Sequence, residues 1–131
     1  MKVSKLAPVL FAERIEPCLE LWEKRLGFKT TVSVPEGDHL GFVILERDGV
    51  EVMYQTWQSA AEDIAELGEQ ARSSRQFLFL EIADLAAFER ALAGIAPVVP
   101  KRTTFYGMTE VIIHDPAGHV IVFAEPTARA S

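Results

Sequence analysis

The chain carries one supersecondary pattern twice, and this internal repeat constrains its fold more than any other feature. Residues 47–55 (RDGVEVMYQ) run from charged residues through a tight glycine turn into a strand, and residues 114–126 (HDPAGHVIVFAEP) repeat that order. The repeat extends backwards, because residues 10–15 and residues 80–85 each lead into the start of a helix. Both pairs are offset by about seventy positions, which indicates one unit written twice. Two such units predict a curved sheet that encloses a cavity.

The first unit is predicted to span about residues 5–56 and to open with a strand at residues 5–11. Pro17 suits the first turn of a helix, where its missing N–H costs nothing, and Gly27 suits the C-terminal cap. The buried stripe of that helix is expected to hold Ile15, Cys18, Leu19, Trp22 and Leu26. Three strands follow at residues 28–34, 39–46 and 50–56, separated by turns at residues 35–38 and 48–49.

A linker helix at residues 57–76 separates the two units. Ser59 and Glu62 have the spacing of a capping box. Ile64 and Leu67 would share one face of this helix, and Gly68 would stop it.

The second unit is predicted to span about residues 77–126, and Asp84 is expected to cap its helix. The buried stripe of that helix would hold Leu85, Phe88 and Leu92. Its strands are predicted at residues 77–82, 98–104, 107–114 and 119–124. Residues 127–131 are expected to fray.

Composition narrows the class of protein. A chain of 131 residues suits a single domain, residues 1–131. The net charge of −6 argues against nucleic acid as a partner. No apolar run approaches the roughly 20 residues that span a bilayer, so no membrane partner is expected. A single cysteine, Cys18, allows no internal disulfide. Together with the absence of a secretory signal, it predicts a cytoplasmic protein.

The chain resembles the vicinal-oxygen-chelate superfamily, which holds glyoxalase I, extradiol dioxygenases and bleomycin-resistance proteins. The resemblance rests on WEKRLGF (22–28), GVEVMYQ (49–55) and FYGMTE (105–110) leading into DPAG (115–118), and it covers about residues 6–126. It implies an α+β fold in which two βαβββ modules form an open eight-stranded cup. It also implies a homodimer, because single-chain members commonly pair.

Enzymes of this family place four metal ligands, usually His and Glu, on the strands that face the cup. Carried onto this sequence, those positions fall near Ala7, Met53, Phe77 and Val122. Their methyl, thioether, phenyl and isopropyl groups are poor ligands for a divalent cation. A register shift of two residues would bring Glu51 onto the same face. The resemblance therefore points to the metal-free, bleomycin-resistance-like branch, with no cofactor, and leaves catalysis open.

Without a metal, the cup would present an apolar and aromatic surface with a few polar groups, as small-molecule pockets do. The predicted ligand-binding residues are Met53, Trp57, Phe77, Phe79, Tyr106, Val122 and Glu51. No catalytic residue is assigned. The alternative for Phe77 and Phe79 singly is that they pack in an ordinary core.

Each of the remaining polar residues has a functional interpretation and a purely structural one. Glu51 and Glu81 share the parity of the cup-facing residues and are the acid or base candidates, although exposed edge positions are favoured. Arg102 and Tyr106 are candidates for holding an anionic group. His114 and His119 are expected to be solvated turn residues, His39 an exposed strand start, and Cys18 core filler.

Three hypotheses follow. The leading one is a metal-independent binding protein that sequesters an aromatic or cationic compound, such as an antibiotic or a metabolite. The second is a metal-dependent lyase or dioxygenase of the same superfamily, with Glu51 among the metal ligands. The third is an interaction module in which the cup is only core and takes no small ligand.

Overall fold

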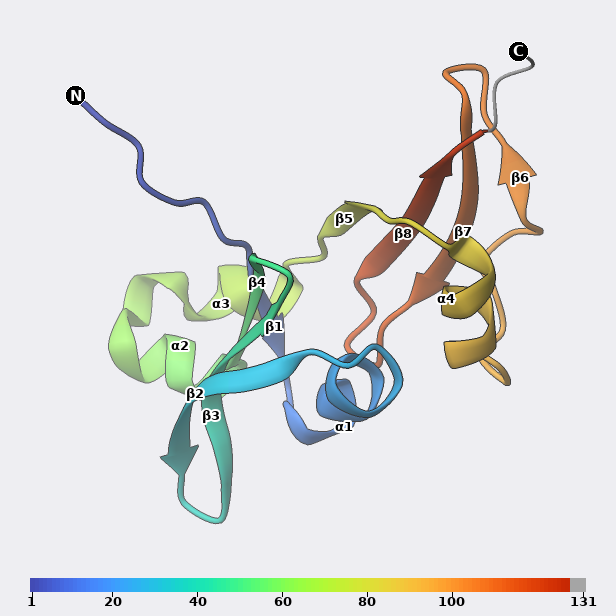
Figure 1. The fold of residues 1–131 in the computed structure, drawn as a ribbon. Helices are drawn as coiled ribbons and strands as arrows, with labels where there is room; N and C mark the ends of the chain where they lie inside the picture. Colours follow the sequence, from blue (N-terminus) through green and yellow to red (C-terminus); the bar gives the residue numbers. More distant parts are fainter. Residues whose placement is uncertain (128–131) are drawn as a thin grey trace. The chain divides into compact units, whose positions relative to one another are not determined.

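The computed structural model describes residues 1–127, which divide into two compact units with the boundary between Arg75 and Gln76. Each unit holds a four-stranded sheet (Figure 1). Among the described residues, no helix is long and apolar enough to cross a membrane.

The sheet of the first unit has the strand order β1-β4-β3-β2. Strand β1 runs parallel to β4, and the other neighbours are antiparallel. The elements are β1 (Val9–Ala12), helix α1 (Glu16–Leu19), the π-helical segment η1 (Glu20–Arg25), β2 (Lys29–Glu36), β3 (His39–Arg47) and β4 (Val50–Thr56).

The core of this unit lies between its sheet and the α1–η1 helix. Trp22 is fully buried and packs edge-on against Phe28, with ring centroids 4.9 Å apart. The predicted helical stripe is wrong at one position, because Leu21 is buried while Leu19 is not. The amide of Leu26 donates to the carbonyl of Leu21 at 3.0 Å, five residues back. Such a π-turn holds an extra residue and shifts the buried face.

The two hairpin turns of the unit differ from prediction in one case. Asp48 and Gly49 form the predicted turn, with φ values of 52° and 80° that are typical of type I′. The other turn is shorter than predicted, because Pro35 and Glu36 still belong to β2. Proline is tolerated there because β2 is an edge strand, which has a neighbouring strand on one side only.

The linker folds as α2 (Trp57–Asp63), the 3-10 turn η2 (Ala65–Leu67) and α3 (Gly68–Ser73). Its cap is Thr56 rather than Ser59, because the Thr56 hydroxyl accepts from the Ser59 amide at 3.0 Å. Gly68 begins α3 instead of ending a helix. Ile64 and Leu67 remain 45% and 43% exposed, so the predicted buried face does not form.

The second unit repeats the topology of the first. Its strand order is β5-β8-β7-β6, with β5 parallel to β8. The elements are β5 (Phe77–Glu81), α4 (Leu85–Ala91), β6 (Arg102–Thr103), β7 (Met108–His114) and β8 (Val120–Pro126). The predicted fold class, α+β with two βαβββ modules, is therefore confirmed.

Helix α4 packs on one face of the second sheet, where Phe88 lies against Phe123 with ring centroids 5.5 Å apart. Asp84 caps the helix as predicted, accepting from the Ala87 amide at 3.2 Å. The predicted strand at 98–104 shrinks to the two residues of β6. Prolines at positions 97 and 100 lack the N–H that a longer strand would need.

The predicted solvated histidine pair is wrong for His119, which is fully buried, while His114 is exposed. His119 Nδ1 accepts from the Gln76 amide at 2.9 Å. Asp115 Oδ1 accepts from the amides of Ala117 at 3.0 Å and His119 at 2.7 Å. This histidine therefore holds the start of β5 to the β7–β8 turn.

Candidate ligand-binding surface

Each sheet has one face that packs against its own helix and an opposite face, termed the free face, that this helix does not cover. On the free face of the second sheet, the β5 residues Phe77, Phe79 and Glu81 are exposed, whereas Met108, Glu110 and Ala124 are buried. In the second unit, strand register assigns residues to these faces, because side chains alternate along a strand. Phe123 packs toward α4, so Val122 belongs to the free face. Phe79 and Ile112 pair with Val122 from either side. These three residues form one apolar row across the sheet.

The free face of the second sheet presents large aromatic side chains. Phe77 is 78% exposed and Phe79 is 53% exposed, both on strand β5. Val120 lies beside Phe77 in the next row. Two exposed phenyl groups on one strand form an apolar patch, and patches of this kind are candidates for binding sites. The sequence prediction placed Phe77, Phe79 and Val122 together on one face, and the register brings them there.

A row that contains two acidic residues lies next to the apolar row of Phe79, Val122 and Ile112. Glu81 pairs with Ala124, Ala124 with Glu110, and Glu110 with Arg102. The small side chain of Ala124 separates the two carboxylates. Glu81 is exposed, whereas Glu110 is only 2% exposed. Sequence reasoning singled out Glu81 and passed over Glu110, although its even spacing from Ile112 on β7 placed it on the same face.

Glu110 is held by two donors from the same unit. Arg102 Nε and Nη2 both reach Glu110 Oε1, at 3.1 and 3.0 Å. The Tyr106 hydroxyl donates to Glu110 Oε2 at 2.5 Å, and this hydrogen bond raises the pKa of Tyr106. Arg102 and Tyr106 were predicted to hold an anionic group. The carboxylate that they contact is the protein's own.

The free face of the first sheet is apolar as well. Met53 pairs with Val9 on β1 and with Ile44 on β3. Glu51 lies two residues before Met53 and therefore shares its face. Its carboxylate forms an ion pair with Lys5 at 2.8 Å and its side chain is 24% exposed. Met53 and Glu51 are thus neighbours, as the sequence predicted.

The positions at which the family's enzymes hold a metal have matching registers in the two sheets. Ala7 lies two residues before Val9, the partner of Met53. Phe77 lies two residues before Phe79, the partner of Val122. The side chains at these positions offer no oxygen or nitrogen, so they do not fit a divalent cation. Residues 1–127 contain no group of three His, Cys, Asp or Glu side chains placed to hold a metal ion.

Trp57 lies elsewhere, at a cavity of about 520 Å³ within the first unit. The Arg72 guanidinium stacks over the Trp57 ring, 5.0 Å from its centroid. Trp57 Nε1 is buried and has no hydrogen-bond partner among the described residues. The residues that line the cavity are Glu13, Arg14, His39, Trp57, Gln58, Ala61, Ala65, Gly68, Glu69 and Arg72. Neither Met53 nor Glu51 is among them.

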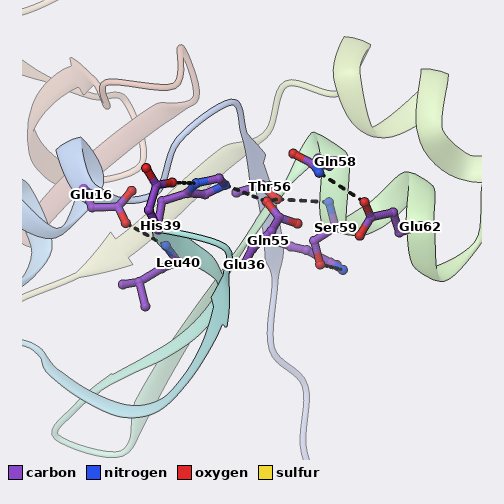
Figure 2. Close-up of polar contacts among 10 residues, drawn as sticks. Glu16, Glu36, His39, Leu40, Gln55, Thr56, Gln58, Ser59 and Glu62 are labelled. Atoms are coloured by element: carbon purple, nitrogen blue, oxygen red, sulfur yellow. Dashed lines mark hydrogen bonds and ion pairs between the residues drawn. The ribbon is translucent and has the colours of Figure 1, made fainter.

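His39 belongs to a polar network beside this cavity (Figure 2). Its Nδ1 lies 3.0 Å from Asp38 Oδ1 and its Nε2 lies 2.9 Å from Glu36 Oε1. The Thr56 hydroxyl donates to the same Glu36 oxygen at 2.9 Å. Hydrogen bonds to Asp38 and Glu36 raise the pKa of His39. The side chain is 17% exposed, so the predicted exposed strand start is wrong.

The repeated βαβββ topology and the free apolar faces define a protein of the glyoxalase fold. The model of the family described as Glyoxalase/Bleomycin resistance protein/Dioxygenase superfamily matches residues 5–123. The chain belongs to that superfamily, as the sequence resemblance predicted.

Solved structures share the fold at low sequence identity. A glyoxalase/bleomycin resistance protein/dioxygenase from Nocardioides is 18% identical, with a TM-score of 0.74 over 100% of this chain and 89% of that one. A lactoylglutathione lyase from Agrobacterium tumefaciens is 14% identical, with a TM-score of 0.75 over 95% of both chains. The bleomycin-binding protein of bleomycin-producing Streptomyces verticillus, in complex with copper(II)-bleomycin, is 21% identical, with a TM-score of 0.62 over 99% of both. Comparison with curated protein sequences gives no significant match.

Proposed function

We propose that this protein is a metal-independent small-molecule binding protein that sequesters an aromatic or cationic compound on the free faces of its sheets. The observation that carries the proposal is that Phe77 is 78% exposed and Phe79 is 53% exposed on the sheet face that also holds Val122. A core would bury such residues. Stacking on phenyl rings and burial of apolar surface, at about 25 cal/mol per Å², supply the affinity.

The acidic side chains in the row next to Phe79 and Val122 give the site its preference for a cation. Glu81 and Glu110 flank Ala124 in the row next to Phe79. The exposed phenyl faces also attract cations, by about 0.5–2 kcal/mol. The Streptomyces relative that binds bleomycin supports this kind of role. Capture of a toxic compound such as an antibiotic would confer resistance by stoichiometric binding rather than by chemistry.

Binding of aromatic probes tests the proposal. Titration with a cationic aromatic dye should give saturable binding to the natural protein. The double variant Phe77→Ala/Phe79→Ala should weaken it at least about tenfold, because each truncation removes a large apolar contact. Leu67→Ala is the control, since Leu67 is an exposed apolar residue outside the sheets. Equal binding by both variants would contradict the proposal.

The second candidate function is a metal-dependent lyase or dioxygenase, favoured by the position of Glu51 on the free face beside Met53 and by the lactoylglutathione lyase relative. Elemental analysis of protein purified without a metal-affinity tag, dialysed against Zn²⁺, Ni²⁺, Mn²⁺ or Fe²⁺, separates the two functions. One retained ion per chain, lost in Glu51→Gln, would contradict metal-independent binding and make the enzyme the leading hypothesis. No retained ion supports the binding protein.

We also propose that the protein forms a homodimer, because it belongs to a superfamily whose single-chain members commonly pair. Light scattering during size-exclusion chromatography should give twice the mass of the 14.5 kDa chain. A mass of one chain at micromolar concentration would refute the dimer.

A further inference from the structure

We propose that Arg102 occupies, within the chain itself, a cation-binding position at Glu110, and that a cationic group of the ligand replaces it there. This inference rests on the proposed binding function and names the residue that decides its specificity. Glu110 is the acceptor, and Arg102 is the competitor that the ligand must displace.

Burial makes Glu110 a strong attractor of cations. Its side chain is 2% exposed, although it lies on the free face of the second sheet. A buried carboxylate is costly unless a cation or hydrogen-bond donors compensate it. Arg102 and Tyr106 provide this compensation. If Arg102 moved away, any other cation of suitable size would stabilise the buried carboxylate in its place.

The contact that Arg102 makes is well suited to exchange. Two of the three guanidinium nitrogens, Nε and Nη2, converge on Glu110 Oε1, rather than spanning the two carboxylate oxygens as the strongest arginine pairs do. The Arg102 side chain is 54% exposed. It sits on β6, an edge strand of only two residues. Short edge elements open at low cost, so the guanidinium can leave while β7 and β8 stay intact.

The surroundings of Glu110 fit a ligand that joins a cation to an aromatic ring. Ala124, between Glu110 and Glu81 in the register, is fully buried. A cationic group that takes the place of the Arg102 guanidinium would therefore contact Glu110, with the exposed Glu81 carboxylate on β5, the strand beyond Ala124. The adjacent row begins with Phe79 on β5, which offers a ring for stacking. The geometry therefore selects a compact aromatic cation over a neutral aromatic of the same shape.

Benzamidine and benzamide provide matched probes, because they share a shape and differ in charge at pH 7. Their binding is followed by amide chemical shifts of residues in β7 and β8. Arg102→Gln should tighten benzamidine binding by about tenfold and change benzamide binding less than about twofold. Arg102→Lys should restore the natural affinities, because a single oxygen acceptor needs only one cationic donor. Arg102→Gln/Glu110→Gln should lose the gain for benzamidine.

Two further outcomes are decisive. If Arg102→Gln does not fold, Arg102→Met carries the test: it keeps an apolar stem of similar length, removes the charge and should tighten benzamidine by about tenfold. If both probes bind and neither variant changes their ratio, the binding function stands and the role of Arg102 is refuted. If neither probe binds any folded variant, the proposed function fails as well.

Discussion

The indole N–H of Trp22 donates to the hydroxyl of Tyr54 at 2.8 Å, and both side chains are fully buried. This bond joins the π-helical segment η1 to the central strand β4 of the first sheet. The extra residue of the π-turn sets the angular position of the helix residues. The Trp22–Tyr54 bond therefore fixes the helix on the covered face and leaves Met53 and Glu51 on the other.

Tyr54→Phe should destabilise the first unit by about 1–3 kcal/mol, because it leaves the buried indole N–H of Trp22 without this acceptor. Chemical denaturation followed by tryptophan fluorescence measures the change. Leu67→Ala serves as the comparison, since Leu67 is 43% exposed and lies outside the sheets. A loss in Tyr54→Phe no larger than in Leu67→Ala would show that the buried bond contributes nothing.

Sequence reasoning recovered the parts of this protein that depend on local patterns. Alternation and the Asp48-Gly49 turn placed β4 correctly, and the repeat supplied the topology of the second unit. The π-turn was missed because i→i−5 bonding leaves no signature in residue spacing, so Leu21 and Leu19 exchanged roles.

The candidate site was predictable only where the alternation of side chains along a strand assigns a residue to one face of the sheet. Parity put Phe79, Val122 and Glu51 on free faces. It could not show that His119 is buried against Gln76, 43 positions away, or that Arg102 neutralises Glu110. Such contacts depend on which segments become neighbours in the folded chain, and the spacing of residues along the sequence does not indicate this. The stacking of Arg72 on Trp57 was not predictable for the same reason, because it depends on how α3 packs beside the Trp57 ring.

Gly49→Ala should destabilise the β3–β4 hairpin by about 1 kcal/mol or more, because Gly49 has a φ of 80°. An added Cβ would meet no atom within 4 Å, so the cost comes from the backbone conformation alone. Gly49→Asn should cost less, since asparagine tolerates this region better. Thermal denaturation ranks the three proteins, and equal stabilities of the alanine and asparagine variants would refute the argument.

His39 should titrate above the ordinary histidine pKa of about 6.5, because Asp38 and then Glu36 hydrogen-bond to its ring. NMR titration of the ring protons measures this midpoint. Asp38→Asn should lower it, and Glu36→Gln should lower it less, following the order of the two causes. An unchanged midpoint in both variants would rule out the network as the source.

The raised pKa of His39 also sets the sign of its effect on stability. A group whose pKa is higher in the folded state stabilises the fold below its unfolded pKa. That contribution is lost as pH rises through the folded pKa. His39→Gln should therefore cost more stability at pH 5.5 than at pH 9. A difference that grows with pH would contradict this assignment.

Tyr106 should ionise above the ordinary tyrosine pKa of about 10, chiefly because its hydroxyl donates to Glu110. Ionisation is read from ultraviolet absorbance, and Tyr106→Phe identifies its contribution beside that of buried Tyr54. Glu110→Gln should lower the Tyr106 midpoint, because a neutral amide stabilises the protonated phenol less than a carboxylate does. Arg102→Gln should raise it, since Arg102 acts on Tyr106 in the opposite sense. If the two variants moved the midpoint in the same direction, the charges of Glu110 and Arg102 would not control this site.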